Sequence, residues 1–295
     1  MAERRRRRRP TRGSQNETAS ADGTPEKKGD NIFSLVAWAL GIAFVFKSFF
    51  LDTFWIPSSS MEPTLEVGDF LVVTKWTYGY NRHSLVFDPP IFKGGRLFAS
   101  SPKRGDVVVF DSTTIGQGGP YTELENGGYH VIKRVVGLPG DHIRLVDGLI
   151  EITTQDGETV SFARQEMERV NQIIEVASVS GRTLEELVTQ VHYEETNPEG
   201  RSYRVRELFD SEGRAFSNGD NYNLTEGAHS RFYPAGVVPQ GHVFVMGDNR
   251  DQSGDSRASL RSVPMHKIVG RARLVVFSLG ESWVPRWDRF FRPIR

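Results

Sequence analysis

The feature that most constrains this chain is a run of twenty almost entirely apolar residues, from Ile32 to Leu51. Its only charge is Lys47, close to the far end. Twenty helical residues extend about 30 Å, which matches the hydrocarbon core of a bilayer, and a lysine near one end can reach the headgroups. We therefore predict a single transmembrane helix over residues 31–51. A cleaved signal peptide is the alternative, but the run exceeds the usual signal-peptide core and no small-x-small site follows before Asp52.

The residues before this run carry a net positive charge. Residues 4–9 are six consecutive arginines, and through Asp30 nine basic residues face five acidic ones with almost no apolar side chains. We expect residues 1–30 to form a disordered basic tail, which the positive-inside rule keeps in the cytoplasm. A nucleic-acid-binding arm is the weaker alternative. Residues 52–295 then form a domain on the outer face of the membrane.

Composition excludes several other classes of protein. The 37 Lys and Arg residues balance 37 Asp and Glu residues, so the net charge of zero gives no reason to expect a nucleic-acid partner. The absence of Cys excludes disulfides, thiolate nucleophiles and iron–sulfur clusters. The seven histidines show no spacing typical of a metal site. We expect neither a metal nor another cofactor.

The external domain has the pattern of a β structure. Short β-branched runs alternate with Gly, Pro and Asp, and we predict strands at 70–74, 106–110, 130–136, 142–152, 242–246 and 268–278. Residues 155–233 read as an insertion on this β core. Within the insertion, Thr183 and Glu186 form a capping box before apolar residues at helical spacing up to Val191, which predicts one helix. The predicted fold class is mainly β, with a mixed insertion.

A serine-rich stretch, P-S-S-S-M-E-P-T-L, occupies residues 57–65, starting six residues beyond the apolar run. Serines between prolines usually form a surface turn. Because this turn follows the predicted membrane helix so closely, it would also place a nucleophile within reach of a membrane-bound substrate.

A lysine lies within an apolar strand at residues 129–141, Y-H-V-I-K-R-V-V-G-L-P-G-D. Side chains alternate along a strand, so Lys133 shares a face with Val131 and Val135. A surface lysine whose amine reaches solvent is the common interpretation. The functional alternative is that apolar surroundings lower the lysine pKa toward neutrality and make the amine a general base.

A polar loop, G-D-N-R-D-Q-S-G-D-S-R, follows a predicted strand at residues 247–257. Its D-x-N-x-D spacing superficially fits a calcium loop, but the later Gly and Glu of an EF-hand are missing. The loop therefore supplies hydroxyls, carboxylates and guanidinium groups that can orient a lysine.

Together the three stretches resemble the motifs of the type I signal peptidases, also called leader peptidases, and they occur in that family's order after a membrane helix. The resemblance implies a bacterial inner-membrane serine endopeptidase that cleaves secretory preproteins after a small-x-small site. It implies contact with the lipid bilayer and with the protein export machinery, and no cofactor. By position it assigns Ser60 as nucleophile, Lys133 as general base, and Ser58 with the Ser60 backbone N–H as the oxyanion hole. The supporting residues it implies are Ser253, Asp255, Arg257, and the ion pair of Arg134 with Asp248.

Substrate-binding positions also follow from the resemblance. They are apolar and line the family's shallow subsites: Phe54, Ile56, Met61, Leu65 and Ile132. These side chains could equally be ordinary core residues. Glu62 stands where the family commonly has an apolar residue. The aromatic and basic residues of 281–295, including Trp283, Trp287, Phe290 and Phe291, suit a membrane interface.

Two other interpretations explain part of the sequence. A membrane-anchored β-rich scaffold without catalysis accounts for the apolar run and the strands, but not for the combination of serine turn, strand lysine and polar loop. A self-cleaving repressor shares a Ser-Lys pair. Its DNA-binding helices, however, are absent from this sequence, and a transmembrane helix is not expected in such a protein.

Overall fold

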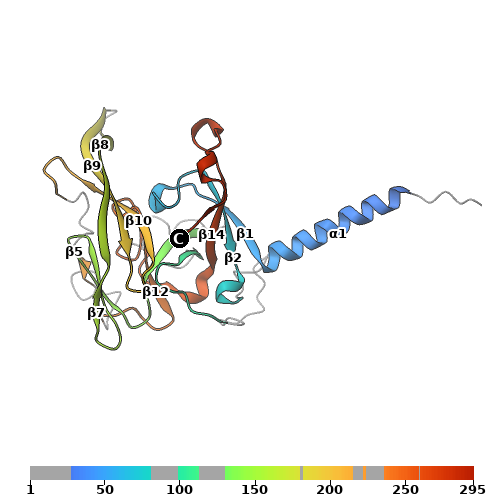
Figure 1. The fold of residues 1–295 in the computed structure, drawn as a ribbon, viewed down its shortest axis with the longest axis horizontal. Coiled ribbons are helices and arrows are strands. Elements are labelled where there is room, and N and C mark those ends of the chain that lie inside the picture. Colours follow the sequence, from blue (N-terminus) through green and yellow to red (C-terminus); the bar gives the residue numbers. More distant parts are fainter. Residues whose placement is uncertain are drawn as a thin grey trace, which may run out of the picture. The chain divides into compact units, whose positions relative to one another are not determined.

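A computed structural model describes residues 28–80, 99–112, 130–179, 182–214, 222–223, 236–258 and 260–295. The predicted disordered tail lies almost wholly outside these ranges. The chain divides into two compact units, Met1–Ile42 and Ala43–Arg295. All the strands of the described residues lie in the second unit (Figure 1).

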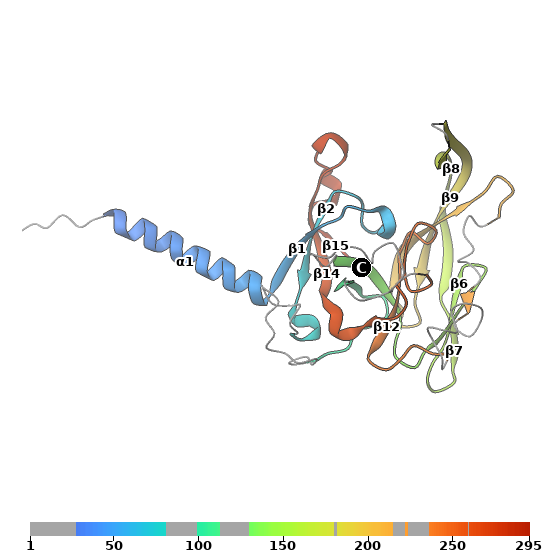
Figure 2. The same cartoon turned by 180° about the vertical axis from the view of Figure 1, so that it is seen from behind.

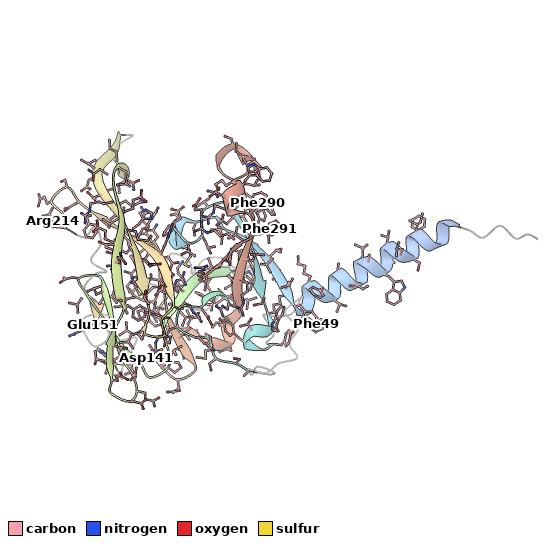
Figure 3. All side chains as sticks on the ribbon, viewed as in Figure 1. Phe49, Asp141, Glu151, Arg214, Phe290 and Phe291 are labelled. Atoms are coloured by element: carbon pink, nitrogen blue, oxygen red, sulfur yellow. The ribbon has the colours of Figure 1, made fainter. Side chains whose placement is uncertain are left out.

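The helix predicted at 31–51 is present as α1, Lys28–Phe49. Its described apolar side chains are exposed, with Phe33 80% and Trp38 71% accessible. Figure 3 shows side chains that project from both sides of the helix. In the described part of the chain, no helix has both the length and the apolar character needed for a bilayer crossing. The helix ends two residues before the predicted end, because Leu51 begins strand β1.

The main sheet has eight strands, and its order is β1-β2-β14-β3-β4-β12-β13, with β15 paired to β14. All the pairings within it are antiparallel. The strands are β1 Leu51–Trp55, β2 Asp69–Thr74, β3 Val107–Asp111, β4 His130–Gly137, β12 His242–Met246, β13 Val263–Pro264, β14 Ile268–Ser278 and β15 Arg292–Pro293. Figure 1 shows β1 and β2 beside β14.

Two further sheets hold the other seven strands of the described residues (Figure 2). One has the order β10-β9-β8 and the other β11-β5-β6-β7. Their strands are β5 His142–Val146, β6 Leu149–Thr153, β7 Thr159–Ser161, β8 Ala163–Val179, β9 Arg182–Thr196, β10 Ser202–Phe209 and β11 Tyr222–Asn223. Short 3₁₀ helices are η1 Ser59–Met61, η2 Trp76–Tyr78, η6 Met265–Lys267, η7 Glu281–Trp283 and η8 Trp287–Arg289.

All six predicted strands are present, one of them as two strands, but the strands of the insertion and β1, β13 and β15 of the main sheet were not predicted. The predicted strand at 142–152 is two strands, β5 and β6, because Asp147 and Gly148 both adopt positive φ and reverse the chain. Strand β1 was not predicted. It pairs with β2 directly after α1, where the sequence reads as a continuation of the apolar run.

The helix predicted from Thr183 is wrong, because these residues lie in strand β9. Strand β9 pairs with β8 from Ala163 opposite Thr196 to Val179 opposite Arg182, so the two strands form one long antiparallel hairpin. A capping box contributes little energy compared with such a ladder of cross-strand pairs, and Val and Thr favour strands. Every helix or strand in the described residues of the insertion is therefore a strand, so this part is not mixed.

Buried side chains form three apolar clusters in the second unit, and one of them supports the serine-rich turn. This cluster joins residues of β2, β3 and β14 to Ile56, Met61 and Leu65 of the turn. Met61 and Leu65 are completely buried. Fully burying an apolar side chain of this size stabilises a fold by about 1.5–3 kcal/mol, so the two residues fix the turn against the sheet on either side of Glu62.

Candidate active site

The serine turn places Ser60 between a buried anchor and the neighbouring strands. Ser60 lies in η1, and the following residue, Met61, is fully buried. The Leu65 N–H donates to the Met61 carbonyl at 2.9 Å, which closes the turn. Ser60 itself stays partly exposed. A serine next to a buried anchor has a fixed backbone and an accessible hydroxyl.

Lys133 lies in the interior of the main sheet and reaches Ser60. It is on β4, opposite Val108 of β3, and is 4% exposed. Its Nζ donates to the Ser60 Oγ at 2.7 Å and to the Ile132 carbonyl at 3.0 Å. Residues 73 positions apart in the sequence therefore meet, as the resemblance implies for a nucleophile and its base.

Burial lowers the pKa of the Lys133 amine, so that its neutral form can act as a general base. Desolvation lowers its pKa from 10.5 to about 8, while the negative charges of Asp255 and Asp248 act in the opposite direction. No carboxylate is within ion-pair distance of Nζ among the described residues. An amine with this pKa is neutral in part of the population near pH 7 and can accept a proton from a hydroxyl.

Ser58 supplies the second hydroxyl group of this site. Its Oγ lies 3.4 Å from the Ser60 Oγ, and the side chain is exposed. Ser58 precedes η1 with extended backbone angles, so it begins the turn whose first residues present both hydroxyls on the same side. This places a hydroxyl donor beside the Ser60 oxygen, where the predicted oxyanion hole requires one.

The polar loop packs directly under the serine turn at Gly247. A Cβ at this position would lie 2.5 Å from the Ser60 carbonyl oxygen and 2.2 Å from the Ser253 Oγ, so only glycine fits. The Ser253 Oγ is buried and has no hydrogen-bond partner among the described residues. Ser253 thus lies close to Ser60, but the hydrogen bond from Lys133 to Ser253 that its predicted orienting role requires is not formed here.

Asp255 and Arg257 form a buried pair that stiffens this loop. Asp255 is fully buried, accepts the Gly247 N–H at 3.0 Å and bonds Arg257 through both of its oxygens. The neighbouring Arg257 lowers the pKa of the Asp255 carboxyl, against the effect of burial. Because Gly247 touches both serines, the pair holds the loop at the position that the site requires.

Arg134 and Asp248 form the predicted ion pair. The Arg134 Nε and Nη2 each donate to one Asp248 oxygen at 2.7 Å, and both side chains are 1% exposed. The guanidinium also donates to the Gly105 carbonyl and stacks on the Tyr203 ring, with 3.8 Å between its central carbon and the ring centroid. This bidentate pair ties strand β4 to the first residues of the polar loop.

The five predicted substrate-binding residues gather in a single apolar cluster beside Ser60. Four are buried in it, namely Ile56, Met61, Leu65 and Ile132, and Phe54 packs against the cluster while partly exposed. The His130 ring lies edge-on to Phe54, with 5.0 Å between ring centroids. In the free chain these side chains are therefore core residues next to the nucleophile.

Three polar contacts near the serine turn were not predicted from the sequence. Asn249 donates to the carbonyls of Ser59 and Ser60, Arg206 pairs with Glu62, and Glu195 pairs with Arg250. The partners are far apart in sequence, and nothing in the local pattern links them. In the sequence only Glu62 indicated such a contact, because it stands where the family commonly has an apolar residue. Within the described ranges, no group of three or more His, Cys, Asp or Glu is placed to hold a metal ion.

Comparisons with known proteins show the family of this chain. The family model described as signal peptidase, peptidase S26, matches residues 30–277. Signal peptidase I of Rickettsia rickettsii (strain Sheila Smith) is 32% identical over 274 residues, covering 92% of this chain and 87% of the relative. Signal peptidase I of Rickettsia typhi (strain Wilmington) is 34% identical over 261 residues, covering 87% and 82%.

A solved structure was also found, the crystal structure of a signal peptidase I from Enterococcus faecalis V583. It is 20% identical and covers 58% of this chain and 97% of that chain, with a TM-score of 0.27. The family model spans most of the chain, and the relatives match over nearly all of their length. This chain therefore belongs to the signal peptidase family, peptidase S26, and is a serine endopeptidase.

Proposed function

We propose that Ser60 and Lys133 cleave signal peptides from preproteins in this chain, as nucleophile and general base respectively. Family membership makes the chain a peptidase of this specificity. The single observation that supports the assignment of these two residues is the 2.7 Å contact between the Ser60 Oγ and the Nζ of a lysine that is 4% exposed. A serine hydroxyl needs an adjacent base to become a nucleophile, and a desolvated amine is such a base.

The reaction then proceeds in two steps. Ser60 Oγ attacks the carbonyl carbon of the scissile bond while its proton passes to the neutral Lys133 amine. The resulting oxyanion accepts hydrogen bonds from the Ser60 backbone N–H and the Ser58 hydroxyl. Lys133 returns the proton to the leaving amine, which frees one fragment and leaves an ester on Ser60. A water deprotonated by the same amine hydrolyses the ester and restores both groups.

The supporting residues act on the position of these groups. We propose that Asp255 with Arg257 and Arg134 with Asp248 hold the polar loop and β4 at fixed separation. We also propose that the Ser253 hydroxyl, which is buried and has no partner among the described residues, bonds Lys133 during the reaction. Two buried, charge-assisted pairs of this kind are rigid. Rigidity matters because a misplacement of about 1 Å at a reacting group costs a large factor in rate.

The small-x-small preference of the family fits the crowded surface beside Ser60. We propose that Phe54 and Ile132 contact the substrate side chains, because Phe54 keeps some exposure and Ile132 is beside Lys133 in β4. Ile56, Met61 and Leu65 form the floor beneath them. Because these buried side chains already fill the space beneath the subsites, the subsites are shallow. They accept small substrate side chains and exclude large ones.

We further propose that the chain is a single-pass protein of the bacterial inner membrane, with a cytoplasmic N-terminus. The support is the run of residues 32–51 with one charge, the arginines that precede it, and the exposure of apolar side chains along α1. The protein export machinery would deliver preproteins to the outer face, where the domain that follows α1 would meet them.

An aromatic surface on the main sheet gives independent support for lipid contact. The rings of Trp55, Phe70 and Phe277 form a row across β1, β2 and β14. Trp55 meets Phe70 edge-on with ring centroids 4.6 Å apart, and Phe70 stacks on Phe277 with centroids 4.0 Å apart. Trp283 extends the row, and it is 70% exposed, while Trp287 is 73% exposed. Exposed tryptophans suit the headgroup layer of a bilayer.

Phe290 and Phe291, labelled in Figure 3, occupy different surroundings on this surface. Phe290 packs against Phe277 and Trp287 and is only partly exposed, whereas Phe291 is 68% exposed. Phe291 is therefore the residue of the two that we expect to enter the headgroup layer.

The catalytic assignment is tested with purified full-length chain in detergent and a secretory preprotein. We expect Ser60→Ala and Lys133→Met to abolish cleavage. The matched control is Lys75→Met, which removes a lysine that is equally buried, at 2% exposed, but pairs with Asp52. Cleavage by either dyad variant at the wild-type rate contradicts the assignment, as does loss of activity in Lys75→Met without loss of folding.

Membrane attachment is tested separately in cell membranes and in lipid vesicles. After alkaline carbonate extraction we expect the chain to remain with the membranes, and its release contradicts the anchor. In vesicles of brominated phospholipid we expect quenching of tryptophan fluorescence, with less quenched intensity after Trp283 and Trp287 are replaced by Ser. Leu149→Ser, an exposed apolar position on β6, is the control. Equal quenched intensity in all variants contradicts lipid contact by the aromatic surface.

A further inference from the structure

Four polar side chains connect strand β10 of the insertion to the serine turn, and we call them the β10 bridge: Glu62, Arg206, Gln252 and Asn249. The Arg206 Nη1 lies 2.7 Å from a Glu62 oxygen, and its Nη2 donates to the Gln252 Oε1 at 3.2 Å. The same Gln252 oxygen accepts from the Asn249 Nδ2 at 3.1 Å. A continuous polar chain thus runs from the residue after Met61 to the polar loop.

Asn249 is the end of the bridge that touches the nucleophile's backbone. It is completely buried. Its backbone N–H donates to the Ser60 carbonyl at 3.2 Å, and its Nδ2 donates to the Ser59 carbonyl at 3.1 Å. Two consecutive carbonyls of the turn are therefore held by one residue. Fixing these carbonyls fixes the direction of the Ser60 N–H and Cβ bonds.

The backbone of β10 holds Asn249 in turn. The Arg206 N–H donates to the Asp248 carbonyl at 2.9 Å, and the Arg250 N–H donates to the Arg206 carbonyl at 3.0 Å. These bonds add the segment around Asn249 to β10 as a short parallel bridge. A strand that supplies two backbone bonds and one side-chain hydrogen bond, from Arg206 to Gln252, to the same loop defines where that loop lies.

A second anchor comes from inside the insertion. Arg250 forms a bidentate pair with Glu195 of β9, with N–O distances of 2.9 and 2.6 Å, and both side chains are 1% exposed. The Tyr203 hydroxyl of β10 donates to the same carboxylate at 2.8 Å. The polar loop is therefore held by two strands of the insertion as well as by the main sheet.

Stability alone is a poor explanation for the Glu62–Arg206 pair. Burial raises the pKa of Glu62 above its ordinary value in spite of the nearby Arg206, and burial lowers the pKa of Arg206 in spite of Glu62. Both directions mean that desolvation of each charge outweighs the attraction between them. Such pairs are better explained by the geometry that they impose on the chain.

We propose that the β10 bridge positions Ser60 for catalysis, so that the insertion is part of the machinery that holds the nucleophile. The proposal rests on the proposed function of Ser60. Glu62, Arg206 and Asn249 are positioning residues: they touch neither substrate nor Lys133, and they act through the backbone of the serine turn. Loss of the bridge lets the turn move and lengthens the contact between Ser60 and Lys133, which lowers the rate of the chemical step.

The test is a charge-swap experiment on purified full-length chain with a preprotein substrate. Glu62→Arg and Arg206→Glu each place like charges opposite one another, and we expect each to lower kcat at least about tenfold with KM within about twofold. The double variant restores opposite charges, and we expect it to recover most of the lost kcat. The control is Arg204→Glu, the same charge change two residues away on β10, where the side chain is exposed.

A second variant removes one hydrogen-bond donor and keeps the shape of the side chain. Asn249→Asp replaces the Nδ2 donor by an oxygen facing the Ser59 carbonyl, so we expect a fall in kcat without a matching rise in KM. Thermal unfolding of every variant is measured alongside. A positioning role predicts that the double swap restores kcat, whereas a purely structural role predicts that kcat follows the unfolding temperature.

The proposal is overturned if both single swaps keep wild-type kcat, if the double swap recovers nothing, or if Arg204→Glu loses as much as Arg206→Glu. The proposed function fails in a different way. In that case wild-type chain does not cleave the preprotein, or Ser60→Ala cleaves it as fast as wild type does.

Discussion

Replacing the proposed general base should stabilise the protein near neutral pH while it abolishes activity. Lys133 is 4% exposed and has a pKa lowered from 10.5 to about 8. Below pH 8 the amine is protonated in both the folded and the unfolded chain, so the folded state then carries a buried charge without an ion-pair partner among the described residues. Lys133→Met keeps the length of the side chain and removes that charge.

The size of the effect follows from the pKa. At about 1.4 kcal/mol per pH unit, lowering the pKa from 10.5 to about 8 corresponds to about 3 kcal/mol of unfavourable free energy at pH 7. The variant also loses the hydrogen bonds of Nζ to Ser60 and Ile132, at about 1 kcal/mol each. We therefore expect the free energy of unfolding of Lys133→Met to exceed that of wild type by about 1 kcal/mol at pH 7.

The difference must change with pH, and the direction is fixed. Between pH 8 and 10.5 the unfolded chain binds more protons at this lysine than the folded chain does, so the free energy of unfolding of wild type rises with pH. Above pH 10.5 the penalty is gone, and wild type keeps its two hydrogen bonds. We expect the order of stability to reverse in the upper part of this range.

The assay is urea unfolding in detergent at pH 7 and pH 10.5, followed by tryptophan fluorescence. Lys75→Met is the control, because removing Lys75 leaves Asp52 without its partner at 3.0 Å and should lower stability at neutral pH. The reasoning is refuted if Lys133→Met is less stable than wild type at pH 7, or if the difference between them is the same at both pH values.

Three further predictions concern the rate and the fold. The kcat of wild type should rise tenfold per pH unit on the acid side and level off above the Lys133 pKa of about 8, as measured with a preprotein from pH 5 to 10. A pH-independent kcat would contradict this. Ser58→Ala should lower kcat about 100-fold with KM little changed, because one oxyanion donor is lost; an unchanged kcat excludes Ser58 from this role. Arg134→Met should lower the free energy of unfolding by about 3–5 kcal/mol in urea titrations, because Asp248 is left buried and unpaired. A loss below about 1 kcal/mol would contradict a strong dependence of the fold on this pair.

Local sequence was enough to predict six of the strands and to single out Lys133, whereas the pairing of Ser60 with Lys133 was implied by the resemblance to a known family. β-Branched runs mark β2, β3, β4, β12 and β14 because each has a buried face that only apolar residues satisfy. Lys133 stands out because a charge in the middle of such a run is unusual. Lys133 is buried because its face of β4 is covered, and Val135 on the same face is completely inaccessible.

Long-range pairings were not predictable from a local pattern. Residues 183–191 have helical spacing and a capping box, and only their pairing with the strands β8 and β10 makes them a strand. Glu62 pairs with Arg206, 144 positions later, and Asn249 reaches back 190 positions to the Ser59 carbonyl. Such contacts depend on how three sheets pack, and a turn-rich stretch such as the polar loop looks the same in sequence whether it is exposed or buried.

The measurement that tests this account most directly is the titration of the Lys133 amine itself. Full-length chain with isotope-labelled lysine side chains can be followed by NMR from pH 6 to 11, with Lys133→Met used to assign the signal. The account predicts one lysine that titrates near pH 8 and whose signal changes in Ser60→Ala. A Lys133 signal that titrates near 10.5, with no response to Ser60→Ala, would contradict it.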